Sequence, residues 1–292
     1  FFSQNDRIFG LPLSLHPMYR KKASVGQHAL DYINAELNIR IIHFRRLIKA
    51  VNITKRLPFP QYDIQDYDDD PSKIAEMVRR SWLLPRGPIR NLTESVEQAG
   101  CVVVWCHFQQ TPIYGISYRI PDLPPFIFLN TEQPADRMRF SLAHELGHLV
   151  MHHIPSMEME DQANNFASSL LMPAADIKST LMGKTTLPSI ASLKPIWKTS
   201  IQAIIERAVD LGTISQAQHR SLWKQLSASR MRFKEPPELD FTHEQPHMLE
   251  AIFDFYRTKL KYTVDQISEI LFCDRPDLFS LYPFLNGNGK RH

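Results

Sequence analysis

The chain has 292 residues, 43% of them apolar, which is enough for a sizeable core and about two domains. Its formal net charge of +3 is too small to indicate nucleic-acid binding by itself. The sequence has no apolar run of the roughly 18–20 residues that a membrane helix needs, and no basic-then-apolar leader. Composition therefore indicates neither membrane insertion nor export.

The three cysteines, Cys101, Cys106 and Cys273, are spaced neither as a disulfide framework nor as a C-x-x-C metal knuckle. If residues 101–107 form a strand, Cys101 and Cys106 lie on opposite faces of it. We expect three reduced, mostly buried thiols in a cytoplasmic protein.

Residues 1–69 are predicted to form an N-terminal segment with an irregular start, a long basic amphipathic helix and an acidic linker. Between about residues 24 and 51, apolar residues recur at steps of three and four, which indicates one long helix. The stripe would pack on the rest of the chain or pair with a second copy in a homodimer. Its members are Leu30, Ile33, Leu37, Ile41, Phe44, Ile48 and Val51.

Charge is unevenly distributed in this segment. Residues 1–60 carry ten Lys and Arg against three Asp and Glu, whereas residues 61–70 carry five Asp and no base. The basic half could contact DNA phosphates, although a solvated helix face followed by an acidic linker is the simpler interpretation. We place the linker at about residues 55–70.

Residues 70–184 combine helical and strand patterns and are predicted to form an α+β core. Asp70 and Pro71 suit the start of a helix, and Gly100 suits the end of a second one. Three strand-like runs follow, at about 101–108, 114–120 and 125–130. Two more helices are expected, one containing "SLAHELGHLVMHH" (141–153) and one spanning about 158–172.

Residues 185–292 are predicted to form a C-terminal helical domain with helix-turn-helix-like pairs. Such pairs could bind DNA or form a small bundle. Possible capping boxes mark three of the helix starts. They are Thr199 with Gln202, Ser215 with Gln218, and Thr263 with Gln266.

His144, Glu145 and His148 fit the H-E-x-x-H pattern. On a helix, residues four apart share a face, so both imidazoles can reach one zinc ion at about 2.0–2.1 Å. Glu145 would then act as the general base on the attacking water. The rest of this helix is apolar, and burying two histidines and a glutamate without a partner would be costly, which favours a metal site. Gly147 suggests that another backbone or a substrate comes close.

A third protein ligand is expected from the next helix. Its candidates are Glu158, Glu160 and Asp161, and only Glu160 falls on the helix face marked by Ala163 and Phe166. Glu160 is therefore the predicted third ligand.

His152 lies one turn beyond His148 and could support that ligand or touch the substrate, or it could simply suit the negative end of the helix dipole. The group that stabilises the oxyanion stays open between Tyr114, Tyr118, His152 and several arginines. Ile154 stands where metzincins need a third histidine, which excludes that class.

Two stretches, "RFSLAHELGHLVMHH" and "EDQANNFASSLLMP", together resemble the ImmA/IrrE-type metallopeptidases associated with Xre-type helix-turn-helix regulators. That family has H-E-x-G-H followed by E-x-x-A-N-x-F-A and L-L-x-P, and every motif residue is present here. The likeness covers about residues 70–215 and is weaker at both ends.

The resemblance implies a gluzincin-like minimal metallopeptidase core with a small mixed sheet. It implies Zn²⁺ held by His144, His148 and Glu160, with Glu145 as the base. It also implies a protein substrate, namely a helix-turn-helix repressor or antitoxin-like regulator whose cleavage derepresses genes. The absence of an initial Met would agree with a DNA-binding domain further upstream.

Two functions are therefore expected as alternatives. The first is a zinc endopeptidase that cleaves such a regulator. The second is a zinc-containing transcriptional regulator, toxin or sensor module that binds DNA or a partner without proteolysis.

Overall fold

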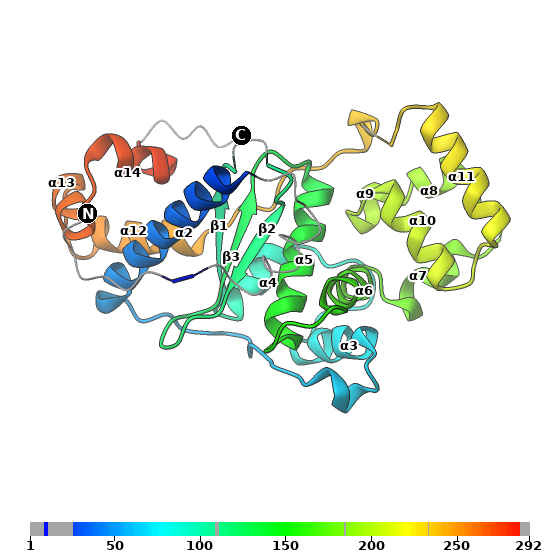
Figure 1. The fold of residues 1–292 in the computed structure, drawn as a ribbon, viewed down its shortest axis with the longest axis horizontal. Helices are drawn as coiled ribbons and strands as arrows, with labels where there is room; N and C mark the ends of the chain where they lie inside the picture. Colours follow the sequence, from blue (N-terminus) through cyan, green and yellow to red (C-terminus); the bar gives the residue numbers. More distant parts are fainter. Residues whose placement is uncertain (1–8, 11–25, 109–110, 184, 233, 287–292) are drawn as a thin grey trace.

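The computed structural model describes residues 9–10, 26–108, 111–183, 185–232 and 234–286. A three-stranded sheet lies in the middle of the molecule with helices on both of its faces, which confirms the α+β prediction (Figure 1). The strands are β1 (Val102–Cys106), β2 (Gly115–Tyr118) and β3 (Phe126–Asn130). Their order is β1-β3-β2, with β1 parallel and β2 antiparallel to β3, so β2 is an edge strand.

The strands are almost entirely buried, and alternate residues of β1 and β3 belong to two separate hydrophobic clusters, whereas Ile116 and Tyr118 of β2 both belong to the second. In β3, Ile127 and Leu129 face the first cluster, whereas Phe126 and Phe128 face the second. Cys101 and Cys106 also fall into different clusters, which confirms that they lie on opposite sides of the sheet.

The first cluster joins the sheet to the helices of the central part of the chain. These helices extend from behind the sheet to the right of Figure 1, where the last of them along the chain lie. They are α3 (Pro71–Ser81), α4 (Leu92–Gln98), α5 (Ala135–Met151), α6 (Met159–Leu171), α7 (Ala174–Leu181), α8 (Leu187–Ala191), α9 (Lys194–Trp197), α10 (Ile201–Asp210) and α11 (Gln216–Ala228).

The second cluster covers the opposite face with helices from the two ends of the described chain (Figure 1). The Tyr256 hydroxyl donates to the carbonyl of Leu47 at 2.9 Å, and Arg40 donates to the carbonyl of Leu281 at 2.8 Å. The helices are α2 (Gln27–Leu47), α12 (Met248–Thr258), α13 (Val264–Leu271) and α14 (Arg275–Leu281). Short 3₁₀ turns lie at Ile48–Ala50, Ile64–Tyr67, Pro237–Leu239 and Pro283–Asn286.

The apolar stripe of α2 packs on the sheet within the chain. Leu37, Ile41 and Phe44 are fully buried in the second cluster. A homodimer through this helix would therefore have to use its other face. On that other face, Arg40 is buried against Glu36, and the guanidinium of Arg46 stacks on Phe272 of the C-terminal helices.

Residues 55–70, predicted to be a linker, lie along the core instead of standing free of it. Leu57 and Phe59 pack against the first cluster, and the Tyr62 amide donates to the carbonyl of Val150 at 2.9 Å. The domain boundaries after residues 69 and 184 remain predictions. No helix in the described part of the chain is both long and apolar enough to cross a membrane.

Helix starts follow the expected capping chemistry with one exception. Asp70 caps α3 with Pro71 in its first turn, and both the Ser215 and Thr263 capping boxes are formed. The box predicted at Thr199 is wrong, because the N-cap of α10 is Ser200. Thr199 is instead buried, with its hydroxyl 3.5 Å from the sulfur of Met172.

Candidate metal centre and active site

Helix α5 carries both motif histidines and lies between the sheet and α6. It begins after Pro134, which leads into its first turn, and ends at His152, whose backbone is extended. Because His144 and His148 are one turn apart, both point to the same side, toward α6.

Gly147 explains how closely α6 approaches α5. A Cβ at this position would lie only 2.9 Å from Cδ1 of Phe166. The close neighbour is thus a ring of α6, not the backbone or substrate expected from the sequence. The approach brings Glu160, at the start of α6, alongside the two histidines.

His144, His148 and Glu160 form one cluster of ligand atoms. The Nε2 atoms of His144 and His148 are 3.0 Å apart, and they lie 3.6 and 3.3 Å from the Oε2 and Oε1 atoms of Glu160, respectively. Donors bound at about 2.0–2.2 Å in a tetrahedron would be roughly 3.3–3.6 Å apart. The donor set and its spacing therefore fit a divalent cation such as zinc.

The two other acidic candidates lie outside this cluster. Glu158 is exposed at the N-cap of α6, and Asp161 is exposed one residue beyond Glu160. The helical periodicity had separated these three acids in the same way. Burial lowers the pKa of His144 to about 4, and the neighbouring His148 acts in the same direction. His144 is therefore neutral at pH 7, as a metal ligand must be.

Each of the two motif histidines makes a hydrogen bond through its Nδ1 atom. His144 Nδ1 is 2.9 Å from the amide oxygen of Asn164, so Nδ1 carries the proton and Nε2 is left as a donor to a metal. His148 Nδ1 is 2.9 Å from His152 Nδ1, and His152 Nε2 is 3.0 Å from the amide oxygen of Gln162. His152 therefore contacts His148 and Gln162 in addition to lying at the negative end of the helix.

Sequence reasoning did not single out Asn164 and Gln162 as site residues. A signal was present for Asn164, because it lies four residues after Glu160 and so on the same face of α6. No comparable signal marks Gln162. Its contact with His152 depends on the conformation of the loop between α5 and α6.

Glu145 is 2% exposed, and its Oε2 accepts a hydrogen bond of 2.7 Å from the Ser117 hydroxyl on β2. Burial raises the pKa of Glu145 above its ordinary value, and the hydrogen bond from Ser117 partly offsets this effect. A carboxylate with a raised pKa, fixed beside a cluster of metal-type ligands, is suited to accept and return a proton. The sequence did not single out Ser117.

The expected place of Tyr118 beside a substrate needs correction. Because strand residues alternate, Ser117 points toward α5 and Tyr118 points toward the second cluster. Tyr118 is 4% exposed, and its hydroxyl donates to Asn34 of α2 at 3.2 Å. Tyr114, considered with it, does line the pocket described next.

A pocket of about 580 Å³ opens on His144, Glu145 and Glu160. One side is formed by the start of β2 and by α5, and the facing wall is formed by α10 and α11. The wall residues are Ser200, Gln202, Ala203, Glu206 and Trp223.

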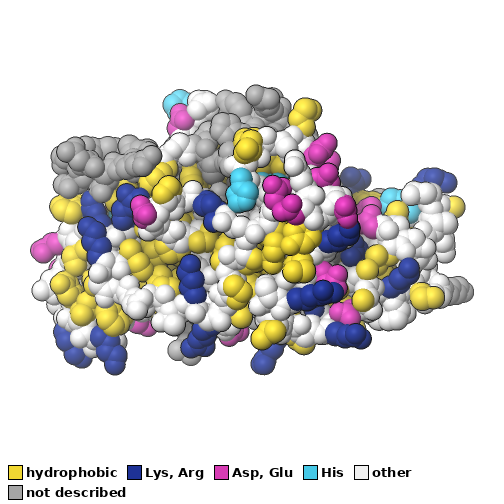
Figure 2. All heavy atoms as spheres, turned by 90° about the horizontal axis from the view of Figure 1, so that it is seen from below, with side chains coloured by type: hydrophobic (Ala, Val, Ile, Leu, Met, Phe, Trp, Pro, Cys, Tyr) yellow, Lys and Arg dark blue, Asp and Glu magenta, His cyan; other side chains and the backbone are white. Residues whose placement is uncertain are grey.

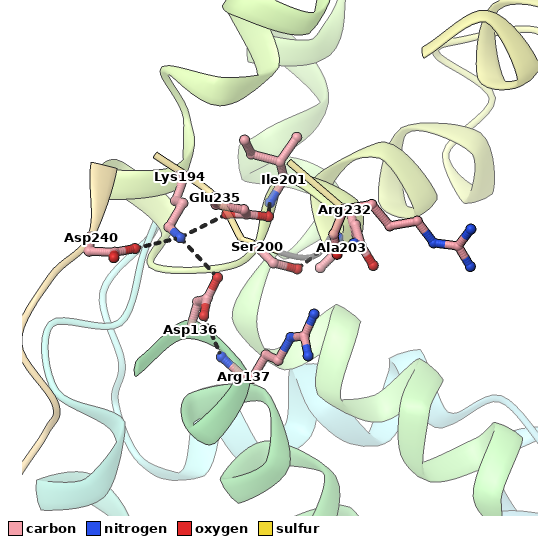
Figure 3. Close-up of polar contacts among 10 residues, drawn as sticks. Asp136, Arg137, Lys194, Ser200, Ile201, Ala203, Arg232, Glu235 and Asp240 are labelled. Carbon is pink, nitrogen blue, oxygen red and sulfur yellow. Dashed lines mark hydrogen bonds and ion pairs between the residues drawn. The ribbon is translucent and has the colours of Figure 1, made fainter. Parts of the chain in front are cut away.

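A buried lysine joins this wall to α5 (Figure 3). Lys194 is 1% exposed, and its Nζ lies 3.0 Å from Asp136 in the first turn of α5. The same Nζ lies 2.7 Å from Glu235 and 2.9 Å from Asp240. The other oxygen of Glu235 accepts from the amide of Ile201 at the start of α10. The pocket walls are therefore fixed relative to each other by buried ionic contacts.

An H-E-x-x-H helix with a glutamate from the next helix is typical of metal-dependent peptidases. Residues 96–208 match the family model of the IrrE N-terminal-like domain, Peptidase_M78. The match confirms the resemblance to ImmA/IrrE-type proteins over these residues. No curated protein matches the chain.

Proposed function

We propose that this protein is a zinc-dependent endopeptidase with a gluzincin-like core. The observation that carries the proposal is the convergence of His144, His148 and Glu160, with the buried carboxylate of Glu145 beside them. The peptidase family of residues 96–208 supports it independently.

The residues of the chain can be given roles in peptide hydrolysis. A bound zinc ion would supply a Lewis acid that polarises the scissile carbonyl and lowers the pKa of water. Glu145 takes a proton from the attacking water and returns it to the leaving amine. Ser117 holds Glu145 in place, and Asn164 and His152 orient the two imidazoles.

The substrate chain is proposed to lie along β2, which is an edge strand of the sheet formed by the described residues. Gly115 on this strand lines the pocket beside Glu145. An extended peptide could add to this edge by main-chain hydrogen bonds and present its carbonyl to the cluster. This arrangement requires a substrate segment that is extended or can unfold locally.

A helix-turn-helix repressor or antitoxin-like regulator is the proposed substrate, as the family resemblance implies. The test is to incubate the zinc-loaded protein with candidate regulators, beside Glu145→Gln and, as a matched control, Glu158→Gln. Glu158 is an exposed residue outside the ligand cluster. Cleavage by the wild type and by Glu158→Gln, but not by Glu145→Gln, is expected. Cleavage that persists in Glu145→Gln would contradict the mechanism.

The alternative, a regulator that binds DNA or a partner without proteolysis, predicts binding that survives Glu145→Gln with no cleavage of any partner. DNA contact through α2 would have to do without Arg40 and Arg46, which pack on the C-terminal helices. On the face in Figure 2, Lys and Arg are spread among apolar side chains instead of forming one patch. These features favour the peptidase proposal.

A further inference from the structure

We propose that α10 and α11 form a subsite that accepts a basic side chain of the substrate, with Glu206 as the carboxylate that determines specificity. The inference rests on the proposed peptidase function and names the substrate class. Glu206 and Trp223 line the same pocket as His144 and Glu145. A side chain of a peptide bound at the cluster would therefore face them.

Glu206 is oriented before any substrate binds. Its Oε1 accepts hydrogen bonds from Trp223 Nε1 at 2.7 Å and from His219 Nε2 at 2.9 Å. The side chain is still half exposed, so it keeps access to a ligand. A carboxylate held by two donors gives up little freedom when it binds a cation.

The charge of the pocket favours a cation. Among the described residues that line it, Arg137 is the one lysine or arginine, and it is outnumbered by carboxylates. Asp136 is paired with Lys194 (Figure 3), while Glu145 and Glu160 have roles at the proposed metal centre. The carboxylates left for a substrate are Asp161 and Glu206.

Trp223 adds an aromatic surface next to Glu206. The guanidinium carbon of Arg232 lies 5.5 Å from the centroid of the Trp223 ring, so this ring already has one cation–π contact. An indole beside a fixed carboxylate suits the apolar stem and charged head of lysine or arginine. The side-chain amide of Gln202 also donates to the carbonyl of Arg232, which links α10 to the segment that follows α11.

A purely structural role for Glu206, joining α10 to α11, can be separated from recognition. Glu206→Gln keeps a side-chain oxygen that can accept from Trp223 and His219 but removes the charge. Glu206→Lys reverses the charge. Glu269→Gln makes the same neutral change at an exposed position of α13, outside the pocket, and serves as the control.

The first measurement is binding, with zinc-loaded Glu145→Gln protein and two synthetic peptide pools that differ only in carrying Lys or Glu at the randomised positions. Trp223 fluorescence reports binding, and Trp223→Phe identifies its signal. We expect the Lys pool to bind about fivefold more tightly, as suits one exposed ion pair. Glu206→Gln should remove this preference, Glu206→Lys should reverse it, and Glu269→Gln should keep it. Equal binding of the two pools, or binding of neither, would overturn the subsite.

The second measurement is cleavage by the zinc-loaded wild type of a peptide library made by cutting a proteome after glutamate. Mass spectrometry should find Lys or Arg enriched at one position near the cleaved bonds, and the enrichment should vanish in Glu206→Gln. Cleavage with the same enrichment in Glu206→Lys would refute the subsite but leave the peptidase intact. Binding of the Lys pool without cleavage of any peptide would contradict the peptidase and leave the subsite standing.

Discussion

Gly115 and Glu145 lie in direct contact, although they belong to different elements. A Cβ at Gly115 would come within 2.8 Å of Cγ of Glu145, closer than side chains normally approach. The edge strand β2 therefore packs closely against Glu145, the proposed general base, and Ser117 on the same strand donates a hydrogen bond to its carboxylate. The position of this carboxylate depends on β2 as much as on α5.

Gly115→Ala should displace Glu145 while leaving the three ligands in place. A shift of about 1 Å in a catalytic group can cost about 100-fold in rate, so we expect a loss of kcat/KM of at least tenfold. Zinc content should be unchanged. Kinetics and elemental analysis of the same sample test this, and full activity would show that Glu145 can move without consequence.

Gly147→Ala should instead act on stability. Its Cβ would meet the Phe166 ring at 2.9 Å, and overpacking of this kind costs about 1–3 kcal/mol. Alanine regains about 1 kcal/mol of helix propensity, so the net loss in unfolding free energy should be at most about 2 kcal/mol. Urea unfolding measures it, with Gly26→Ala as the control because a Cβ there meets open space. A Gly147→Ala variant more stable than the wild type would contradict this prediction, because it would show that Phe166 and α6 shift at little cost.

Lys194→Met should destabilise the protein in a pH-dependent way. Burial alone would lower the pKa of Lys194, but its hydrogen bonds with Glu235 and Asp240 and the charge of Asp136 raise it. Removing one partner from such a buried cluster costs about 3–5 kcal/mol at pH 7. The pocket wall should also loosen, because Glu235 loses its anchor while it still binds the start of α10.

The sign of the pH effect follows from Glu235. Burial raises its pKa, and the hydrogen bond from Lys194 opposes the rise, so the pKa climbs further without the lysine. The folded state then binds more protons than the unfolded state, and stability should increase as the pH falls from 7 toward 5. Lys198→Met, a partly exposed control, should lose less than about 1 kcal/mol. Stability of Lys194→Met that is flat with pH would contradict this account.

Arg40→Met should loosen the contact between the two ends of the chain. Arg40 is buried, paired with Glu36 at 2.8 Å and bonded to the carbonyl of Leu281, so its loss strands a carboxylate. We expect a loss of about 2–4 kcal/mol and faster amide exchange in α14. Arg45→Met, whose guanidinium stacks on Phe9, is the control and should cost less. Equal losses would show that α2 contributes only general packing.

Local signals were sufficient to predict that His144, His148 and Glu160 lie together. The spacing of His144 and His148, and the helical periodicity that selects Glu160, use contacts within single helices or between consecutive ones. The three strands were likewise predicted within a few residues, because each is a short apolar run bounded by turns.

Long-range contacts could not be predicted in this way. Ser117 meets Glu145 across 28 residues of sequence, and the wall of α10 and α11 comes from even further along the chain. Tyr118 was kept as a candidate because a strand's alternation does not say which of its faces meets the active-site helix. The Thr199 cap failed by one residue because burial of its hydroxyl overrode the capping pattern.

The central claim is that side chains of α5 and α6 hold one zinc ion together, and the zinc content of the purified protein tests it most directly. Elemental analysis should find about one zinc per chain in the wild type, and His148→Ala should weaken zinc binding at least 100-fold. His153→Ala, an exposed neighbour outside the cluster, should keep the metal. A wild type that binds no divalent ion, or equal loss in both variants, would contradict the account.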